Sequence, residues 1–185
     1  QTCALPISPS RTEPVFWRGK ASSSELLALP RQNTGSVRLG VRANTSTNIR
    51  ARLASAAEGA RRNDTPIAAA AQTETEGARL LATGGQMDPA HWPGGVPRVE
   101  RIFRPSIAYR MCLVADGGAD AMLSFRDTWE WDLAAGELIA REAGALVTDA
   151  TGAPHRYNAA RPAVAGALAA GPALHAALLA RLTGR

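Results

Sequence analysis

A fourteen-residue segment, Trp131–Gly144 (WDLAAGELIAREAG), constrains the fold more than any other part of the chain. Its apolar and small residues recur at helical spacing, and Gly144 provides a C-terminal stop. The segment therefore predicts an amphipathic helix that begins at Asp132, with Glu137 and Arg141 paired on its outer side. We expect its buried stripe to consist of Trp131, Ala135, Leu138, Ile139 and Ala143.

The first residue of this predicted helix is an aspartate, Asp132. Backbone N–H groups and the helix macrodipole favour an anion such as phosphate at a helix N-terminus. A carboxylate at the same place repels that phosphate, and a divalent cation bound between the two removes the conflict. The local pattern therefore indicates metal-assisted phosphate chemistry, with Asp132 as a metal ligand and a catalytic residue.

Helices and strands alternate along the rest of the chain. Ser106 is a suitable N-cap for a helix that runs to Ala115 and stops at Gly117-Gly118. Gly171-Pro172 opens a terminal helix with an apolar face of leucines. Strands are predicted at residues 80–83, 119–125, 145–148 and 163–169, and residues 98–103 form either a short helix or an edge strand. This alternation predicts a layered α/β (α+β) fold.

Composition excludes several classes of protein. The formal net charge is +5, but the basic residues are scattered arginines and aromatic residues make up only 5%, so we expect no nucleic-acid binding. No apolar run reaches the roughly 18 residues that span a bilayer, which leaves peripheral membrane association open. The two cysteines, Cys3 and Cys112, form no disulfide framework and favour the cytoplasm; we expect Cys112 to pack as a small hydrophobic residue.

The helix segment resembles the second signature of the inositol monophosphatase superfamily, W-D-x-A-A-G-x-L-I-x-x-E-A-G-G, and departs from it only at Ala145. The resemblance extends upstream through residues 106–121 and downstream through residues 146–152. The run Trp129-Glu130-Trp131-Asp132 is most similar to the 3'(2'),5'-bisphosphate nucleotidases of that superfamily. The resemblance to the superfamily covers residues 56–185.

Residues 1–55 do not fit this resemblance. The chain begins with glutamine, residues 1–7 look like a translated sequencing adapter, and the following stretch has little hydrophobic periodicity. We therefore expect residues 1–55 to be a non-native or disordered segment, and residues 56–185 to be the C-terminal part of a phosphatase domain.

The resemblance implies a fold and a reaction. The fold is the C-terminal portion of an α-β-α-β-α sugar-phosphatase sandwich, and the reaction is Mg²⁺-dependent hydrolysis of a small phosphate monoester. Members of the family often form homodimers, so the resemblance also implies a homodimer. Asp132 matches one family metal ligand. The family's D-P-x-D-G-T motif and its E-E pair do not occur in the 185 residues. Because Mg²⁺ needs several oxygen ligands, we expect the isolated chain to lack activity.

Three further residues are candidates for substrate binding. Ser106 lies at the family's substrate-side helix start, Arg126 is suited to a second phosphate, and Glu130 to a ribose hydroxyl or a metal-bound water. Each also has a purely structural interpretation: an N-cap, a solvated loop arginine and a carboxylate beside a site. We expect Trp129 and Trp131 to be packing residues, and the histidines to lie on the surface or in loops. They are His91, His155 and His175.

The preferred function is hydrolysis of adenosine 3',5'-bisphosphate to AMP and phosphate. An inositol or histidinol phosphate phosphatase is the alternative within the same class. A catalytically dead fragment, acting as a binding module, is the alternative from another class.

Overall fold

A mixed sheet forms the centre of the computed structural model, which describes residues 24–32, 36–43, 51–52, 59–62 and 65–184. Within these residues it has five strands in the order β7-β6-β8-β10-β9. The strands are β6 (Arg79–Leu81), β7 (Glu100–Ile102), β8 (Ala121–Trp129), β9 (Leu146–Thr148) and β10 (Ala163–Ala170). β6 runs parallel to β7 and β8, whereas β10 runs antiparallel to β8 and β9.

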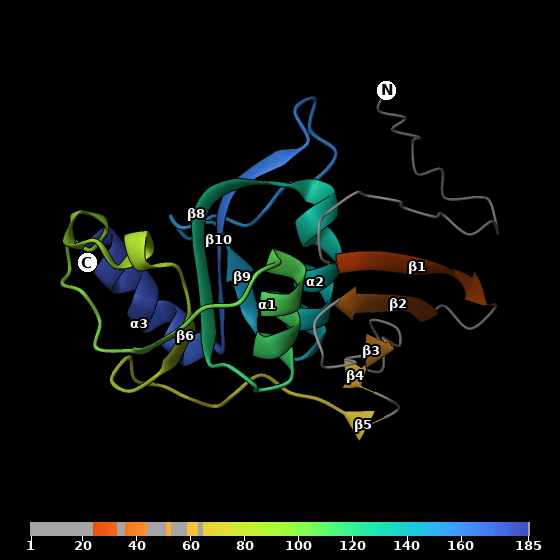
Figure 1. Ribbon diagram of the computed structural model, residues 1–185, viewed down its shortest axis with the longest axis horizontal. Helices are drawn as coiled ribbons and strands as arrows, with labels where there is room; N and C mark the ends of the chain where they lie inside the picture. The colour runs from red at the N-terminus through yellow and green to blue at the C-terminus, as the bar shows by residue number, and fades with distance from the viewer. Residues whose placement is uncertain (1–23, 33–35, 44–50, 53–58, 63–64, 185) are drawn as a thin grey trace.

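Helices cover both faces of this sheet (Figure 1). The helices α1 (Ile107–Ala115) and α2 (Glu130–Glu142) lie on one face, and α3 (Pro172–Thr183) lies on the other. Met111 and Leu133 pack with Met122 of β8 in one core, while Leu174 and Leu178 of α3 belong to a second core. The predicted layered α+β fold is therefore confirmed.

The first half of β8 is buried on both sides. Asp120 and every residue of β8 from Ala121 to Ser124 are buried. Met122 enters the core beside α1 and α2, and Leu123 the core beside α3, because helices cover both faces of the sheet.

The turn before β8 is held by an ion pair. Asp120 accepts bonds from the guanidinium of Arg79 at 2.7 and 3.1 Å and from its backbone N–H at 2.7 Å. Arg79 also donates to the carbonyl oxygens of Gly117 and Gly118. Burial raises the pKa of Asp120, but the bonds and the charge of Arg79 outweigh it and hold that pKa below its ordinary value.

A second sheet lies beyond α1 and α2, on the side away from the central sheet (Figure 1). It has the order β1-β2-β3 and its strands are antiparallel. They are β1 (Ser24–Gln32), β2 (Ser36–Ala43) and β3 (Ala51–Arg52). These strands fall within residues 1–55, so the structure differs there from the expected non-native or disordered segment. The missed signal is the alternation of Val37, Leu39 and Val41 with polar residues or glycine.

Two predicted features lie outside the described residues: the adapter-like residues 1–7 and the start of the resemblance at residues 56–58. The described residues on either side of positions 63 and 64 form an antiparallel pair, β4 (Arg61–Arg62) and β5 (Thr65–Pro66).

The three predicted helices are present, and only α2 starts at a different residue from the one predicted. Ser106 is the N-cap of α1 and accepts a bond from the Tyr109 N–H at 3.4 Å, and Pro172 opens α3. The signature helix α2 starts at Glu130, two residues before the predicted start. Its stripe also differs, since Leu138 is 37% exposed while Leu133 is buried. No helix in the described part of the chain is long and apolar enough to cross a membrane.

The region between β6 and α1 has little regular structure beyond β7. Residues 84–91 contain two single 3₁₀ turns, η1 (Gly84–Met87) and η2 (Pro89–His91). The sequence left residues 98–103 as either a short helix or an edge strand. The structure shows an edge strand, because β7 lies at the end of the sheet order.

The two helices on one face approach each other most closely at Gly136 of α2. A methyl group at this position would lie 2.8 Å from Met111 Cβ and 3.4 Å from Ala108 Cα, both on α1. Neither atom is the far end of a flexible side chain, so only glycine permits this spacing.

We predict that Gly136→Ala lowers the free energy of unfolding, although alanine favours a helix by about 1 kcal/mol over glycine. Overpacking against α1 costs about 1–3 kcal/mol and outweighs that gain. Urea unfolding measures the difference. The control Ala134→Gly, at an exposed position of the same helix, measures the propensity term alone. A Gly136→Ala protein as stable as the original would contradict the close packing.

Candidate functional site

The N-termini of α1 and α2 lie at the same end of the helix pair. Ala108, in the first turn of α1, meets Gly136, the seventh residue of the 13-residue helix α2. Further along, Cys112 and Ala115 share a core with Ile139 and Ala143. The helices therefore run side by side in the same direction, as Figure 1 shows. The first turn of α2, which carries Asp132, extends beyond the start of α1, and its unpaired N–H groups and positive dipole end favour an anion there.

Asp132 occupies the first turn of α2, as predicted. Its side chain is half-buried, and among the described residues it has no hydrogen-bond or ion-pair partner. Burial raises the pKa of this carboxyl because the charged form loses solvation. A carboxylate in this state gains most from a bound cation, which would restore the lost electrostatic stabilisation.

Two arginines, one on α1 and one on β8, lie close enough to influence each other. Arg110, on α1, is largely buried, and its Nε has no hydrogen-bond partner among the described atoms. Burial, followed by repulsion from Arg126 on β8, lowers the pKa of Arg110. In the part of the chain that the structure describes, no carboxylate pairs with either guanidinium. Like charges held together without a counter-ion suit a multiply charged anion.

Arg110 was missed by the sequence analysis. Its position on α1, one turn after the N-cap Ser106, was the available signal. That spacing puts both residues on one side of the first turns of the helix. The proximity to Arg126, however, depends on how β8 packs and could not be read from the chain.

The other predicted substrate residues have structural partners. Ser106 has φ 64° and ψ 118°, a strained conformation for a residue with a side chain. Both carboxylate oxygens of Glu130 accept backbone N–H bonds, from Asn158 at 2.9 Å and from Ala159 at 3.3 Å. Glu130 thus anchors the segment before β10. Substrate contacts by Ser106, Arg126 and Glu130 stay predictions.

The tryptophans on either side of Glu130 stack on each other. The rings of Trp129 and Trp131 are 4.8 Å apart with an interplanar angle of 7°. Trp129 is nevertheless 46% exposed. This pair immediately precedes Asp132, so an exposed aromatic surface adjoins the first turn of α2.

The described residues contain no cluster of three or more histidine, cysteine, aspartate or glutamate side chains that could hold a metal ion. Asp132 fits the role of a single ligand, since its carboxylate is unpartnered and partly desolvated. Mg²⁺ demands near-octahedral oxygen coordination. This part of the chain therefore supplies one ligand and not a complete magnesium site.

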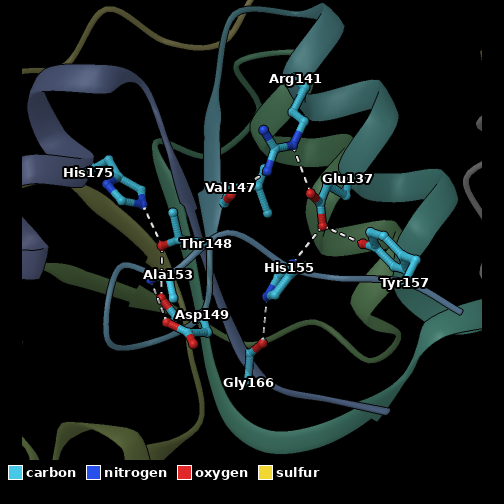
Figure 2. A network of polar contacts seen from close by, with 10 residues as sticks. All are labelled: Glu137, Arg141, Val147, Thr148, Asp149, Ala153, His155, Tyr157, Gly166 and His175. Atoms are coloured by element: carbon cyan, nitrogen blue, oxygen red, sulfur yellow. Dashed lines mark hydrogen bonds and ion pairs between the residues drawn. The ribbon is translucent and has the colours of Figure 1, made fainter. Parts of the chain in front are cut away.

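The far side of α2 carries a polar network that the sequence analysis misplaced (Figure 2). The Glu137–Arg141 pair forms at 2.7 Å, but the Glu137 side chain is only 6% exposed instead of facing outward. His155, expected on the surface or in a loop, lies in a loop with its side chain 2% exposed. His175 is also buried, and its Nε2 lies 2.9 Å from the hydroxyl of Thr148.

Cys112 packs as the sequence predicts. Its side chain is buried between α1 and α2, and burial raises the pKa of its thiol to about 12. A thiol in that environment stays protonated and unreactive at neutral pH.

The fold and the arrangement around Asp132 define a class of protein, and comparison with known sequences identifies it. The model of the inositol monophosphatase family matches residues 26–183, so the chain belongs to this family. The match begins thirty residues before the start that the sequence motifs indicate. An uncharacterized protein from Rhizobium leguminosarum bv. phaseoli is 42% identical over 49 residues, which are 26% of this chain and 52% of that protein.

Solved structures share the fold. An IMPase from Thermotoga maritima has a TM-score of 0.65 at 22% identity, covering 87% of this chain and 61% of its own. SaIMPase-II with bound inositol monophosphate has a TM-score of 0.64 at 16% identity; the match covers 80% of this chain and 63% of that chain. SaIMPase-II with bound 2'AMP has a TM-score of 0.62 at 15% identity; the match covers 80% of this chain and 61% of that chain. The chain thus spans less than two thirds of the length of these proteins.

We predict opposite effects of neutralising two aspartates. At pH 7, Asp120→Asn should lower the free energy of unfolding by about 1.5–3 kcal/mol, the usual value of bonds to a charged group. The lowered pKa of Asp120 means that this contribution disappears as pH falls through that pKa. The raised pKa of Asp132 has the opposite sign: folding disfavours its ionised form, so Asp132→Asn should leave stability unchanged or increased.

Thermal unfolding of both variants at pH 7 and pH 3 tests this pair of predictions. The Asp120→Asn deficit should shrink at the lower pH. A marked loss of stability in Asp132→Asn at pH 7 would show that its carboxylate supports the fold and is not poised for a ligand.

Proposed function

We propose that the parent protein of this chain is a Mg²⁺-dependent phosphomonoesterase that acts on a small phosphate ester. The observation that carries the proposal is the unpartnered, partly desolvated Asp132 carboxylate in the first turn of α2. Arg110 and Arg126, which have no carboxylate partner among the described residues, give it further support. Membership of the inositol monophosphatase family supports the same reaction class.

The residues divide the chemical tasks. Bound Mg²⁺ would supply Lewis-acid activation of water and neutralise charge on the phosphate ester. Asp132 would contribute one ligand to that ion. The arginines and the two helix N-termini would hold and orient the phosphate groups, which is the main requirement in phosphoryl transfer.

Adenosine 3',5'-bisphosphate is the substrate that we favour, with AMP and phosphate as products. Two guanidinium groups without counter-ions suit a substrate with a second phosphate. The exposed face of Trp129 adjoins this region and could accept a planar base. A neighbour in fold, SaIMPase-II, has been solved with 2'AMP.

An inositol phosphate phosphatase is the second candidate. The same neighbour was also solved with inositol monophosphate, which requires neither a second phosphate site nor an aromatic surface. A binding module without catalysis is the candidate from another class, because the described residues supply only one clear metal ligand.

The substrate test compares two phosphate esters on the full-length protein. We expect a higher kcat/KM for adenosine 3',5'-bisphosphate than for inositol 1-phosphate. Arg110→Met should lower kcat/KM for the bisphosphate roughly tenfold to hundredfold, the usual effect of losing a charge-assisted bond. Arg98→Met, at an exposed arginine before β7, is the matched control and should have no effect. Faster turnover of inositol 1-phosphate would favour the second candidate.

Magnesium titration of the present chain by calorimetry separates an enzyme part from a dead fragment. Millimolar or tighter binding that Asp132→Asn abolishes would show that a metal site survives in this chain. Asp127→Asn, at an exposed aspartate of β8, should retain the binding. Absence of heat in the unchanged chain would favour the catalytically dead fragment.

A further inference from the structure

The carboxylate of Glu137 is the centre of the buried network in Figure 2. Its Oε1 accepts a bond from Arg141 Nε at 2.7 Å, and its Oε2 lies 2.6 Å from Nδ1 of His155. The hydroxyl of Tyr157 donates to the same Oε2. Burial raises the pKa of Glu137, but these bonds and charges outweigh it and lower the pKa, so the carboxyl is ionised at neutral pH.

Both nitrogens of the His155 ring face hydrogen-bond acceptors. Nδ1 meets the Glu137 carboxylate, and Nε2 lies 3.1 Å from the carbonyl oxygen of Gly166. An ionised carboxylate and a backbone carbonyl can only accept. A neutral imidazole carries one N–H and could satisfy only one of them, whereas the imidazolium satisfies both.

We propose that His155 is held as an imidazolium and that its ion pair with Glu137 is a positioning device for α2. The proposal deepens the proposed function in one respect: α2 carries Asp132 in its first turn, so the pair would position the metal ligand. Glu137 and His155 touch no substrate in this proposal and act only through the placement of the helix.

The contacts of the network explain how it fixes α2. His155 belongs to the segment between β9 and β10, and Gly166 lies where the register between β10 and β8 shifts. Gly166 has φ 74°, and a methyl group there would lie 2.4 Å from the Ser124 carbonyl oxygen, so only glycine fits. Arg141 also donates to the carbonyl oxygen of Val147 in β9 at 2.8 Å. One turn of α2 is thus tied to two strands.

Charged groups surround the ring on several elements. From α2, Glu137 faces the ring and Arg141 faces Glu137. From the segment before β10, Tyr157 shares the carboxylate, and Glu130 acts on Tyr157 from the start of α2. Burial raises the pKa of Asp149, but hydrogen bonds from Thr151 and Ala153 and the charge of His155 lower it. β10 contributes only the Gly166 carbonyl. Two carboxylates therefore act directly on His155.

Nitrogen NMR of the labelled full chain tests the protonation state directly, because the chain has 3 histidines that serve as mutual references. At pH 7.5 we expect both ring nitrogens of His155 to be protonated. His175 should be neutral with the proton on Nε2, since Thr148 donates its own hydroxyl proton to the Asp149 carbonyl. One protonated nitrogen at His155 would overturn the proposal.

Glu137→Gln should convert His155 to a neutral ring at the same pH. The matched control is Glu142→Gln, the same change of charge on the same helix at a residue outside the network; it should leave His155 doubly protonated. Loss of the second proton in both variants would mean that net charge, and not the contact with Glu137, holds the imidazolium.

Hydrogen exchange in the second turn of α2 tests the positioning role. We expect Glu137→Gln to speed exchange there about tenfold. The unchanged protein should show the same loss of protection when His155 loses its second proton, after correction for the intrinsic pH dependence of exchange. A contact that only filled space would not follow that titration, and unchanged protection across it would overturn the positioning role.

Should Glu137→Gln fail to fold, the pH titration of the unchanged protein still decides the question. Neither measurement uses magnesium or substrate. Failure of the ion-pair proposal would therefore leave the phosphatase proposal intact, and an absence of magnesium binding would leave the ion pair intact.

Discussion

The close packing of α1 against α2 at Gly136 is the constraint on which the rest of the site depends. It fixes the position of α2, whose first turn carries Asp132, relative to α1. It also lets α1 carry Arg110 toward Arg126 of β8. A wider spacing between the helices would change where Asp132 lies relative to Arg110.

Three buried or half-buried carboxylates divide the structural and functional roles. Asp120 joins β6 to the turn before β8, and Glu137 joins α2 to β9, β10 and the segment between them. Each is surrounded by donors, and the pKa of each is lowered. Asp132 has a raised pKa and no partner among the described residues. Such an unpaired group is expected at functional sites, where local stability is given up for ligand binding.

Local signals were sufficient for much of the fold. The cap at Ser106, the glycine stop after α1 and Pro172 are encoded within one or two turns, and each element formed as predicted. Asp132 was placed in the first turn of α2 for the same reason. The burial of Glu137 and His155 depends on partners eighteen residues apart. A sequence with exposed-looking polar residues gives no periodicity that reveals such a contact, and the same holds for the unpaired Arg110.

The edge strands of the central sheet limit how copies of this chain could associate. Among the described strands, the outermost are β7 and β9, and each has three residues. β7 also presents exposed Glu100 and Arg101. Such short margins offer too few backbone groups for intermolecular strand pairing. A continuous sheet joined between two subunits through either of these two strands is therefore disfavoured from the outset.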